Sequence, residues 1–315
     1  MIILLFLVFC LFLLYVFYSC LKVWLFFKVV HFKRVNTVSS FNSLSALGYD
    51  LFSWKTKMEK NRFSLSVSKK VIINGNIIYG DSSKVVVMLH GFDQCRYDMI
   101  PYANYFYQNN FSIVFFDFRR CGESTGMSYS LGGIELSDFK QVMEFVNQKF
   151  PLLQDLYLCG HSLGATVAAI YAPHDLRVKA LVLDTLYSSA RELLRSYIIN
   201  LPLASSVVNR IVSDIGELLA IYPGFSIQDI NPKYSLARTT MPCLLIHRDA
   251  DLSILPSMAV SVYQKRYQIA PTKLFFLKQP QKTSFSLEQE QRFFKVLDDF
   301  FCEDWKKKSF SQIIQ

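Results

Sequence analysis

The chain has 315 residues, of which 51% are hydrophobic, with 34 Lys and Arg against 25 Asp and Glu and seven cysteines. This composition excludes a disordered chain, a collagen-like repeat and a disulfide scaffold, and the length allows a large α/β domain. The formal net charge of +9 is uneven, because residues 22–70 hold ten basic and two acidic residues, net +8. The rest of the chain is almost neutral.

Residues 1–27 are predicted to form a membrane anchor. Residues 1–21 carry no charge, and about 20 apolar residues let a helix cross the hydrocarbon core of a bilayer. A cleaved signal needs a positive start and small residues before its cleavage point, whereas the bulky pair Phe17 and Tyr18 stands just before Cys20. Acylation at Cys20 is the weaker alternative for the same reason. Membrane lipids are therefore the expected partners of this segment.

Positive residues follow the apolar segment and none precede it. Lys22, Lys28, Lys33 and Arg34 favour a single-pass topology with the main domain in the cytoplasm. Residues 28–62 are expected to form a basic juxtamembrane linker, either attracted to anionic headgroups or simply solvated. No basic helix or alternation of aromatic and basic residues accompanies this charge, so nucleic acid is not an expected partner.

The segment 63–303 is predicted to be one α/β domain. Asn74-Gly75, between two apolar runs, predicts a hairpin turn, because both turn positions must accept positive φ. Six short apolar runs then predict strands, and their continuous hydrophobicity is typical of parallel strands buried on both faces. These runs are Val85–Leu89, Ile113–Phe116, Leu156–Cys159, Ala180–Leu183, Cys243–Ile246 and Leu274–Leu277.

Helical periodicity separates these predicted strands. The helical stretches are Ile134–Phe150, Leu163–Tyr171, Ser257–Ala270 and Leu287–Phe301. Strands that alternate with helices favour a doubly wound, mostly parallel sheet. Residues 188–235 break this order with apolar residues at helical spacing between prolines, which predicts a small helical cap. Residues 304–315 are expected to form a basic, solvated tail.

The sequence Gly160-His161-Ser162-Leu163-Gly164 follows a predicted strand and opens a predicted helix. That context is typical of a nucleophile elbow, in which a sharp turn presents the serine and flanking glycines allow close backbone packing. The Leu163 N–H would point at a developing oxyanion, and the Phe92 N–H is the expected second donor. His90 is expected to be structural, and the ring of His161 to point away from the serine.

Four motifs in this order resemble those of the α/β-hydrolase superfamily. They are His90-Gly91, Asp117 to Ser124, Gly160 to Gly164 and Ile246 to Asp251. The similarity covers about residues 63–303 and is greatest to membrane-anchored Bem46-like and serine-aminopeptidase-like (S33-type) hydrolases. It implies an α/β-hydrolase fold with a helical cap, a nucleophile at Ser162, oxyanion donors at Phe92 and Leu163, and a triad acid at Asp251. Asp249 and Asp184 are the alternative acids.

The resemblance also implies a triad histidine near Lys282 or Thr283, but no histidine follows His247 in the chain. Without a base, serine is a poor nucleophile, and loss of one triad member typically leaves about 10³- to 10⁴-fold catalysis over water. Two further departures are Arg120 and Arg248, which stand where the family commonly has glycine. These arginines would either clash with tight turns or fill them with charge.

We therefore expect weak or lost hydrolysis of an ester, thioester or amide. One alternative is an active serine hydrolase with a non-standard base such as Lys282, and another is a non-catalytic module that binds a lipid or a partner. The apolar cap suggests a hydrophobic or acyl ligand, although such a stripe also serves helix packing. Scattered cysteines and histidines predict neither a metal site nor a disulfide framework, and no cofactor motif is present. Unpaired cysteines fit a reducing, cytoplasmic setting.

Overall fold

The computed structural model describes residues 1–30, 37–198, 203–222, 224–278 and 287–301. Its strands form one eight-stranded sheet in the order β1-β2-β4-β3-β5-β6-β7-β8. The strands are β1 Arg62–Ser68, β2 Val71–Ile78, β3 Asp81–Leu89, β4 Phe111–Phe116, β5 Asp155–His161, β6 Val178–Asp184, β7 Cys243–Arg248 and β8 Thr272–Leu277. β1 and β2 pair antiparallel, and β2 lies antiparallel to β4. The six predicted strands, β3 to β8, are all parallel to one another, which confirms the predicted sheet.

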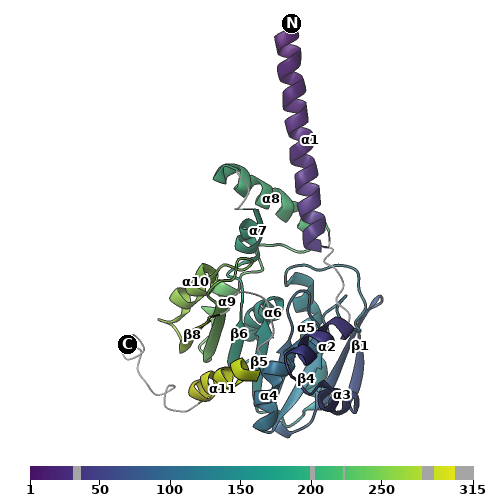
Figure 1. Cartoon of the computed structure of the whole chain (residues 1–315), viewed down its shortest axis with the longest axis vertical. Helices are drawn as coiled ribbons and strands as arrows, with labels where there is room; N and C mark the ends of the chain where they lie inside the picture. The colour runs from purple at the N-terminus through teal and green to yellow at the C-terminus, as the bar shows by residue number, and fades with distance from the viewer. Residues whose placement is uncertain (31–36, 199–202, 223, 279–286, 302–315) are drawn as a thin grey trace.

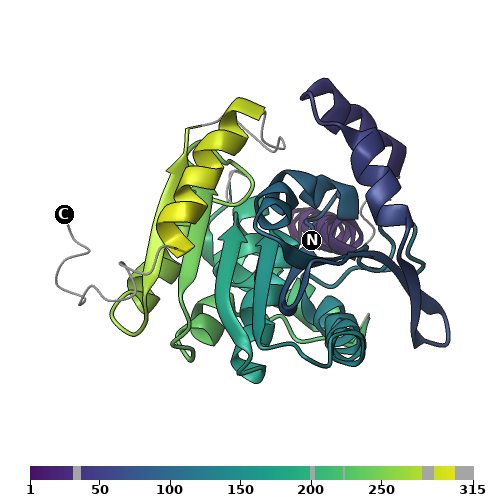
Figure 2. The same ribbon diagram turned by 90° about the horizontal axis from the view of Figure 1, so that it is seen from below.

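Helices cover both faces of this sheet, as Figures 1 and 2 show. One face carries α5 Gly133–Lys149, α6 Leu163–Tyr171 and α10 Pro256–Arg266, and the other carries α4 Ile100–Gln108 and α11 Leu287–Phe301. Alternate residues of β3 enter the two cores: Val85 and Val87 pack towards α5 and α6, whereas Val86 packs towards α4. Burial on both faces explains why the strand sequences show no polar alternation.

The predicted hairpin turn at Asn74-Gly75 is wrong. β2 runs straight through both residues, and the turn lies instead at Lys69 and Lys70, between β1 and β2. Gly75 is needed for space, because a Cβ atom there would collide with the carbonyl oxygen of Phe115 on the adjacent strand. The Asn74 side chain donates a hydrogen bond to a backbone carbonyl at 2.7 Å. Contacts with neighbouring segments, rather than turn formation, account for the Asn-Gly pair.

The linker predicted over residues 28–62 is also wrong in large part. Two helices, α2 Thr37–Ala46 and α3 Leu51–Glu59, occupy most of it. They pack on the same side of the sheet as α4, with Leu44, Trp54 and Met58 buried in that core. Each helix buries only two or three residues. So few apolar positions do not form a recognisable helical periodicity among the basic residues of this segment. The folded body therefore begins well before β1.

The apolar N-terminal segment forms α1 Ile2–Val30, which projects from the body (Figure 1). A helix of this length and composition can cross a membrane, either as a lasting anchor or as part of an export signal. The cap segment 188–235 contains α7 Ala190–Ile198, α8 Ser205–Ile221 and α9 Pro232–Leu236. The predicted basic tail and the loop with Lys282 and Thr283 lie outside the described residues.

Candidate active site

Ser162 sits in a sharp turn between β5 and α6. Its backbone φ of 52° and ψ of −113° lie outside the regions that non-glycine residues prefer. The turn packs closely on its neighbours, because a Cβ atom on Gly160 would lie 2.5 Å from the Ala165 nitrogen, and one on Gly164 would collide with the carbonyl oxygen of Leu89. The Ser162 N–H donates to the Asp184 carbonyl at 2.8 Å. These contacts fix the strained serine at the end of the sheet.

A cavity of about 210 Å³ opens at this turn. It lies beyond the carboxyl ends of β3, β5, β6 and β7, where open α/β sheets commonly bind ligands. Its lining includes Phe92, His161, Ser162, Thr185, Tyr197, Arg248 and Asp251. Tyr197 comes from the cap helix α7, and the other residues lie at strand ends or in the loops that follow them. Within the described ranges, no side chain is hydrogen-bonded to the Ser162 hydroxyl.

The loop that carries Phe92 is held from below by His90. The buried His90 ring accepts the Phe118 N–H at Nε2, at 2.9 Å. Nδ1 must therefore carry the proton of the neutral ring, and it donates to the Gly91 carbonyl at 2.8 Å. Burial lowers the pKa of His90, which keeps the ring neutral. The expected structural role of His90 is confirmed.

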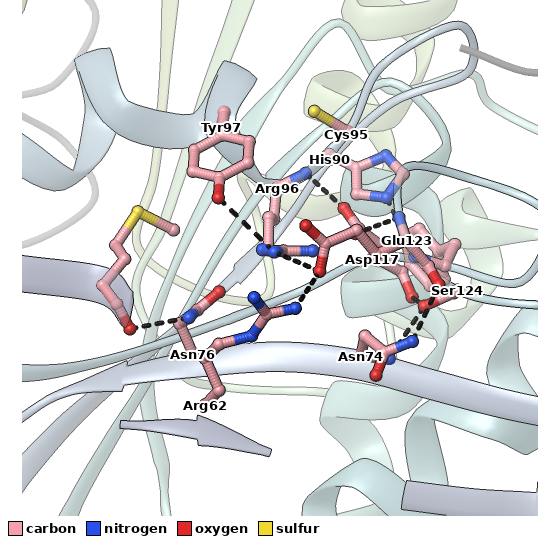
Figure 3. Close-up of polar contacts among 12 residues, drawn as sticks. Arg62, Asn74, Asn76, His90, Cys95, Arg96, Tyr97, Asp117, Glu123 and Ser124 are labelled. Carbon is pink, nitrogen blue, oxygen red and sulfur yellow. Dashed lines mark hydrogen bonds and ion pairs between the residues drawn. The ribbon is translucent and has the colours of Figure 1, made fainter. Parts of the chain in front are cut away.

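A buried ion pair joins the same loop to the one after β4, as Figure 3 shows. The Arg96 guanidinium pairs with the Asp117 carboxylate, and both side chains are buried. The Arg96 N–H also donates to that carboxylate at 2.7 Å, as does the Glu123 N–H at 2.9 Å. The Asp117-to-Ser124 motif thus has a structural role, because it fixes the two loops on which the position of the Phe92 N–H depends.

Three acidic residues were candidates for the triad acid, and their surroundings differ. Asp251 lines the cavity, and its Oδ1 accepts the N–H groups of Ser253 and Ile254 at 2.7 and 2.9 Å. Asp249 is exposed and is not part of the cavity wall. Asp184 is fully buried and is not part of that wall either. The predicted residue is therefore the one of the three that borders the space beside Ser162.

Asp184 is bound by Arg248, one of the two arginines that depart from the family resemblance described above. Arg248 is buried, and its Nη1 donates to Asp184 at 3.1 Å and to Thr185 Oγ1 at 2.8 Å. Burial alone would raise the pKa of Asp184, but the guanidinium and the Tyr102 hydroxyl bring it below its ordinary value. Arg248 was expected either to clash with a tight turn or to fill it with charge. In the structure the charged side chain fills the turn and pairs with Asp184. Arg120 likewise takes a position with φ of 63°, which favours glycine.

The described histidines that approach the cavity are bound to groups other than Ser162. His161 is part of the cavity wall, and its Nδ1 lies 2.9 Å from Gln94 Oε1. His247 is buried with Nε2 2.8 Å from the Ile254 carbonyl, and burial lowers its pKa. Sequence reasoning missed Gln94, because no motif marks a loop residue that only folding brings to the cavity.

Comparisons with known proteins agree with this geometry. The family described as serine aminopeptidase, S33, matches residues 80–215. The uncharacterized protein YqkD of Bacillus subtilis is 26% identical over 126 residues, which are 40% of this chain and 41% of that protein. The match therefore spans about two fifths of the length of this curated relative. Solved structures match over a larger share of the chain.

The esterase Pf2001 of Pyrococcus furiosus matches with a TM-score of 0.60 at 18% identity, over 76% of this chain and 92% of the esterase. The acylaminoacyl peptidase of Pyrococcus horikoshii matches with a TM-score of 0.57 at 17% identity, over 79% of this chain and 42% of the peptidase. These matches show that the chain has an α/β-hydrolase fold, as predicted. The match of residues 80–215 to the serine aminopeptidase family agrees with the predicted resemblance.

The described residues contain no group of three or more His, Cys, Asp or Glu side chains that could hold a metal ion. The positions near Lys282 or Thr283, where the resemblance implies a triad histidine, lie outside the described residues, and the sequence holds no histidine there.

Proposed function

We propose that the protein has a serine-hydrolase site for an ester, thioester or amide in which turnover is weak or lost. Ser162 would attack the carbonyl carbon, the Leu163 and Phe92 N–H groups would bind the oxyanion, and Asp251 would be the remaining acid of the triad. The observation that carries the proposal is a strained serine at a cavity whose hydroxyl has no hydrogen bond to any described side chain. Among the described residues, the serine and its N–H donors are thus found without a proton acceptor on the hydroxyl.

The magnitude of the loss follows from that missing acceptor. A serine at its ordinary pKa is almost wholly protonated at neutral pH, so attack requires a base within hydrogen-bond reach. The N–H donors and substrate binding alone supply about 10³- to 10⁴-fold over water. The apolar side chains of Phe92 and Ile254 in the cavity wall support an acyl or other hydrophobic group as the bound moiety.

We further propose that α1 anchors the protein as a single-pass membrane helix with the body in the cytoplasm. Basic residues on the carboxyl side of the apolar run support this orientation. Membrane lipids would then surround the exposed part of α1, and nucleic acid is not proposed as a partner.

A fluorophosphonate probe tests the state of the serine in the full-length protein. Labelling is expected to be slow and to disappear in Ser162→Ala, because attack proceeds without a base. Ser253→Ala is the matched control, since Ser253 lines the same cavity, and it should leave labelling unchanged. Labelling as fast as that of ordinary serine hydrolases would reveal an activated serine and overturn the loss of turnover.

A second experiment introduces a histidine as general base at the position that the resemblance implies. Lys282→His or Thr283→His should raise hydrolysis of a nitrophenyl ester by about tenfold or more, because general-base catalysis typically contributes about 10²- to 10⁴-fold. The gain should vanish when Ser162→Ala is added. If neither histidine has an effect in a folded protein, the remaining site is not arranged for hydrolysis, and a binding function replaces the proposal.

A further inference from the structure

The helix α1 divides into two parts. The large apolar side chains from Ile2 to Phe17 are exposed, whereas Leu25, Phe26, Val29 and Val30 are buried against the protein. The first charged residue, Lys22, lies between the two parts. About 20 residues at 1.5 Å per residue span the roughly 30 Å hydrocarbon core. With α1 inserted as proposed, the hydrocarbon would end near residues 18–22, although Trp24 and Phe27 beyond this point are also exposed.

The cap helix α8 contacts α1 at this level. Asp214 of α8 accepts a hydrogen bond from the Tyr18 hydroxyl at 2.6 Å, and Lys22 Nζ lies 3.5 Å from the same carboxylate. Arg210, one turn before Asp214, pairs with its other oxygen at 2.9 Å. The lower end of α1 is fixed as well, because the Val30 carbonyl accepts the Tyr129 N–H at 3.2 Å. We call Tyr18, Lys22 and Asp214 the anchor clamp.

We propose that α8 lies against the phospholipid headgroups, held there by the anchor clamp, so that the cap is the membrane-facing side of the body. Figure 1 shows α8 beside the lower part of α1, while the upper part of α1 projects beyond the protein. The exposed residues of α8 are suited to a polar interface and include Ser206, Asn209, Arg210 and Glu217. This inference rests on the proposed membrane insertion of α1 and does not depend on catalysis.

The arrangement also brings the Ser162 cavity close to the bilayer surface. α8 packs on α7 in one apolar cluster, and Tyr197 of α7 lines the cavity. Ser196 ties α7 to the opposite wall, because its hydroxyl lies 3.2 Å from the Ser253 carbonyl oxygen. The helices α7 and α8 would therefore separate the cavity from the headgroup layer, on the side from which an amphiphile in the leaflet would approach.

Lipid quenching of site-specific fluorophores tests the position of α8. The full-length protein, with Cys10, Cys20 and Cys302 replaced by serine, is placed in nanodiscs of phosphatidylcholine that contain a headgroup spin-labelled lipid. A bimane is attached at Ile221→Cys, which is 81% exposed on α8, or at Leu176→Cys, which is 96% exposed beside the amino end of β6. Quenching at 221 is expected to be several times that at 176, and Val207→Cys serves as a second position on α8.

The clamp has its own matched pair of variants. Asp214→Ala should reduce quenching at 221 severalfold, whereas Glu217→Ala, on the exposed face of the same helix, should not. Co-flotation with vesicles reports insertion of α1 separately. Protein that inserts but shows equal quenching at 221 and 176 overturns the position of α8, and protein that fails to insert overturns the anchor on which it rests. Energy transfer between labelled copies without lipid quenching assigns α8 to a second copy and also overturns the proposal.

Discussion

At the scale of single residues, the pair of Arg248 and Asp184 near the cavity is fully buried. Both side chains are buried, so the charge of each is tolerated only because the other compensates it. Removal of one partner from such a pair typically costs about 3–5 kcal/mol, since an uncompensated charge is left behind. Arg248 is thus integral to the fold of this chain.

Arg248→Met is therefore expected to lower the free energy of unfolding by about 3–5 kcal/mol. The exposed Arg191 provides a control, because Arg191→Met should change stability by no more than about 0.5 kcal/mol. Urea denaturation of the detergent-solubilised protein measures both. Equal stability of the two variants would mean that Asp184 is not charged in the folded protein.

At the scale of elements, α2 and α3 extend the body beyond the sheet. The Trp54 indole N–H donates to Asn104 of α4 at 3.0 Å, and its ring lies edge-on to Phe115 of β4. Basic side chains occupy the outer surface of α3, which explains how a stretch of high positive charge is also a packing element. Charge alone did not distinguish a solvated linker from the exposed side of a short helix.

Trp54→Ala should destabilise the protein by about 3–5 kcal/mol, as large-to-small changes of buried aromatic residues do. Phe52→Ala is the matched control on the same helix, because Phe52 is 83% exposed and Trp54 only 5%. Thermal or urea unfolding of both variants gives the comparison. If the two variants unfold at the same temperature or urea concentration, α3 does not pack on the body, and the segment is the linker that its composition predicts.

At the scale of the whole molecule, α1 is part of the folded body as well as a candidate membrane span. Its last turns share an apolar cluster with α7 and α8, and the Tyr129 N–H holds its end. The helix that could enter a membrane is therefore the same helix that packs against the cap.

Phe26→Ala is expected to loosen the cap and speed its cleavage by a protease in limited digestion. Phe26 is 9% exposed, whereas Phe27, the next residue, is 53% exposed, so Phe27→Ala should leave the digestion rate unchanged. The truncation removes buried apolar contacts worth a few kcal/mol only in the first case. Identical digestion patterns would contradict the packing of α1 on the cap.

The sequence by itself determined the parallel strands, four of the helices that cover them and the strand-turn-helix setting of Ser162. Buried parallel strands need continuous apolar runs, and a tight turn between strand and helix needs glycines beside the serine. Both features are therefore determined by residues that are close in the sequence. It also determined that no histidine follows position 247.

Only the tertiary structure decided what depends on distant neighbours. Asn74-Gly75 became the middle of a strand because Phe115 packs against it, and Asp251 rather than Asp249 reached the cavity because of the way its loop turns back. Arg248 binds Asp184, which lies at the end of the adjacent strand. Asp214 in the cap accepts a hydrogen bond from Tyr18, 196 residues earlier in the chain. Such contacts are fixed by the packing of whole elements, which no local pattern of residues encodes.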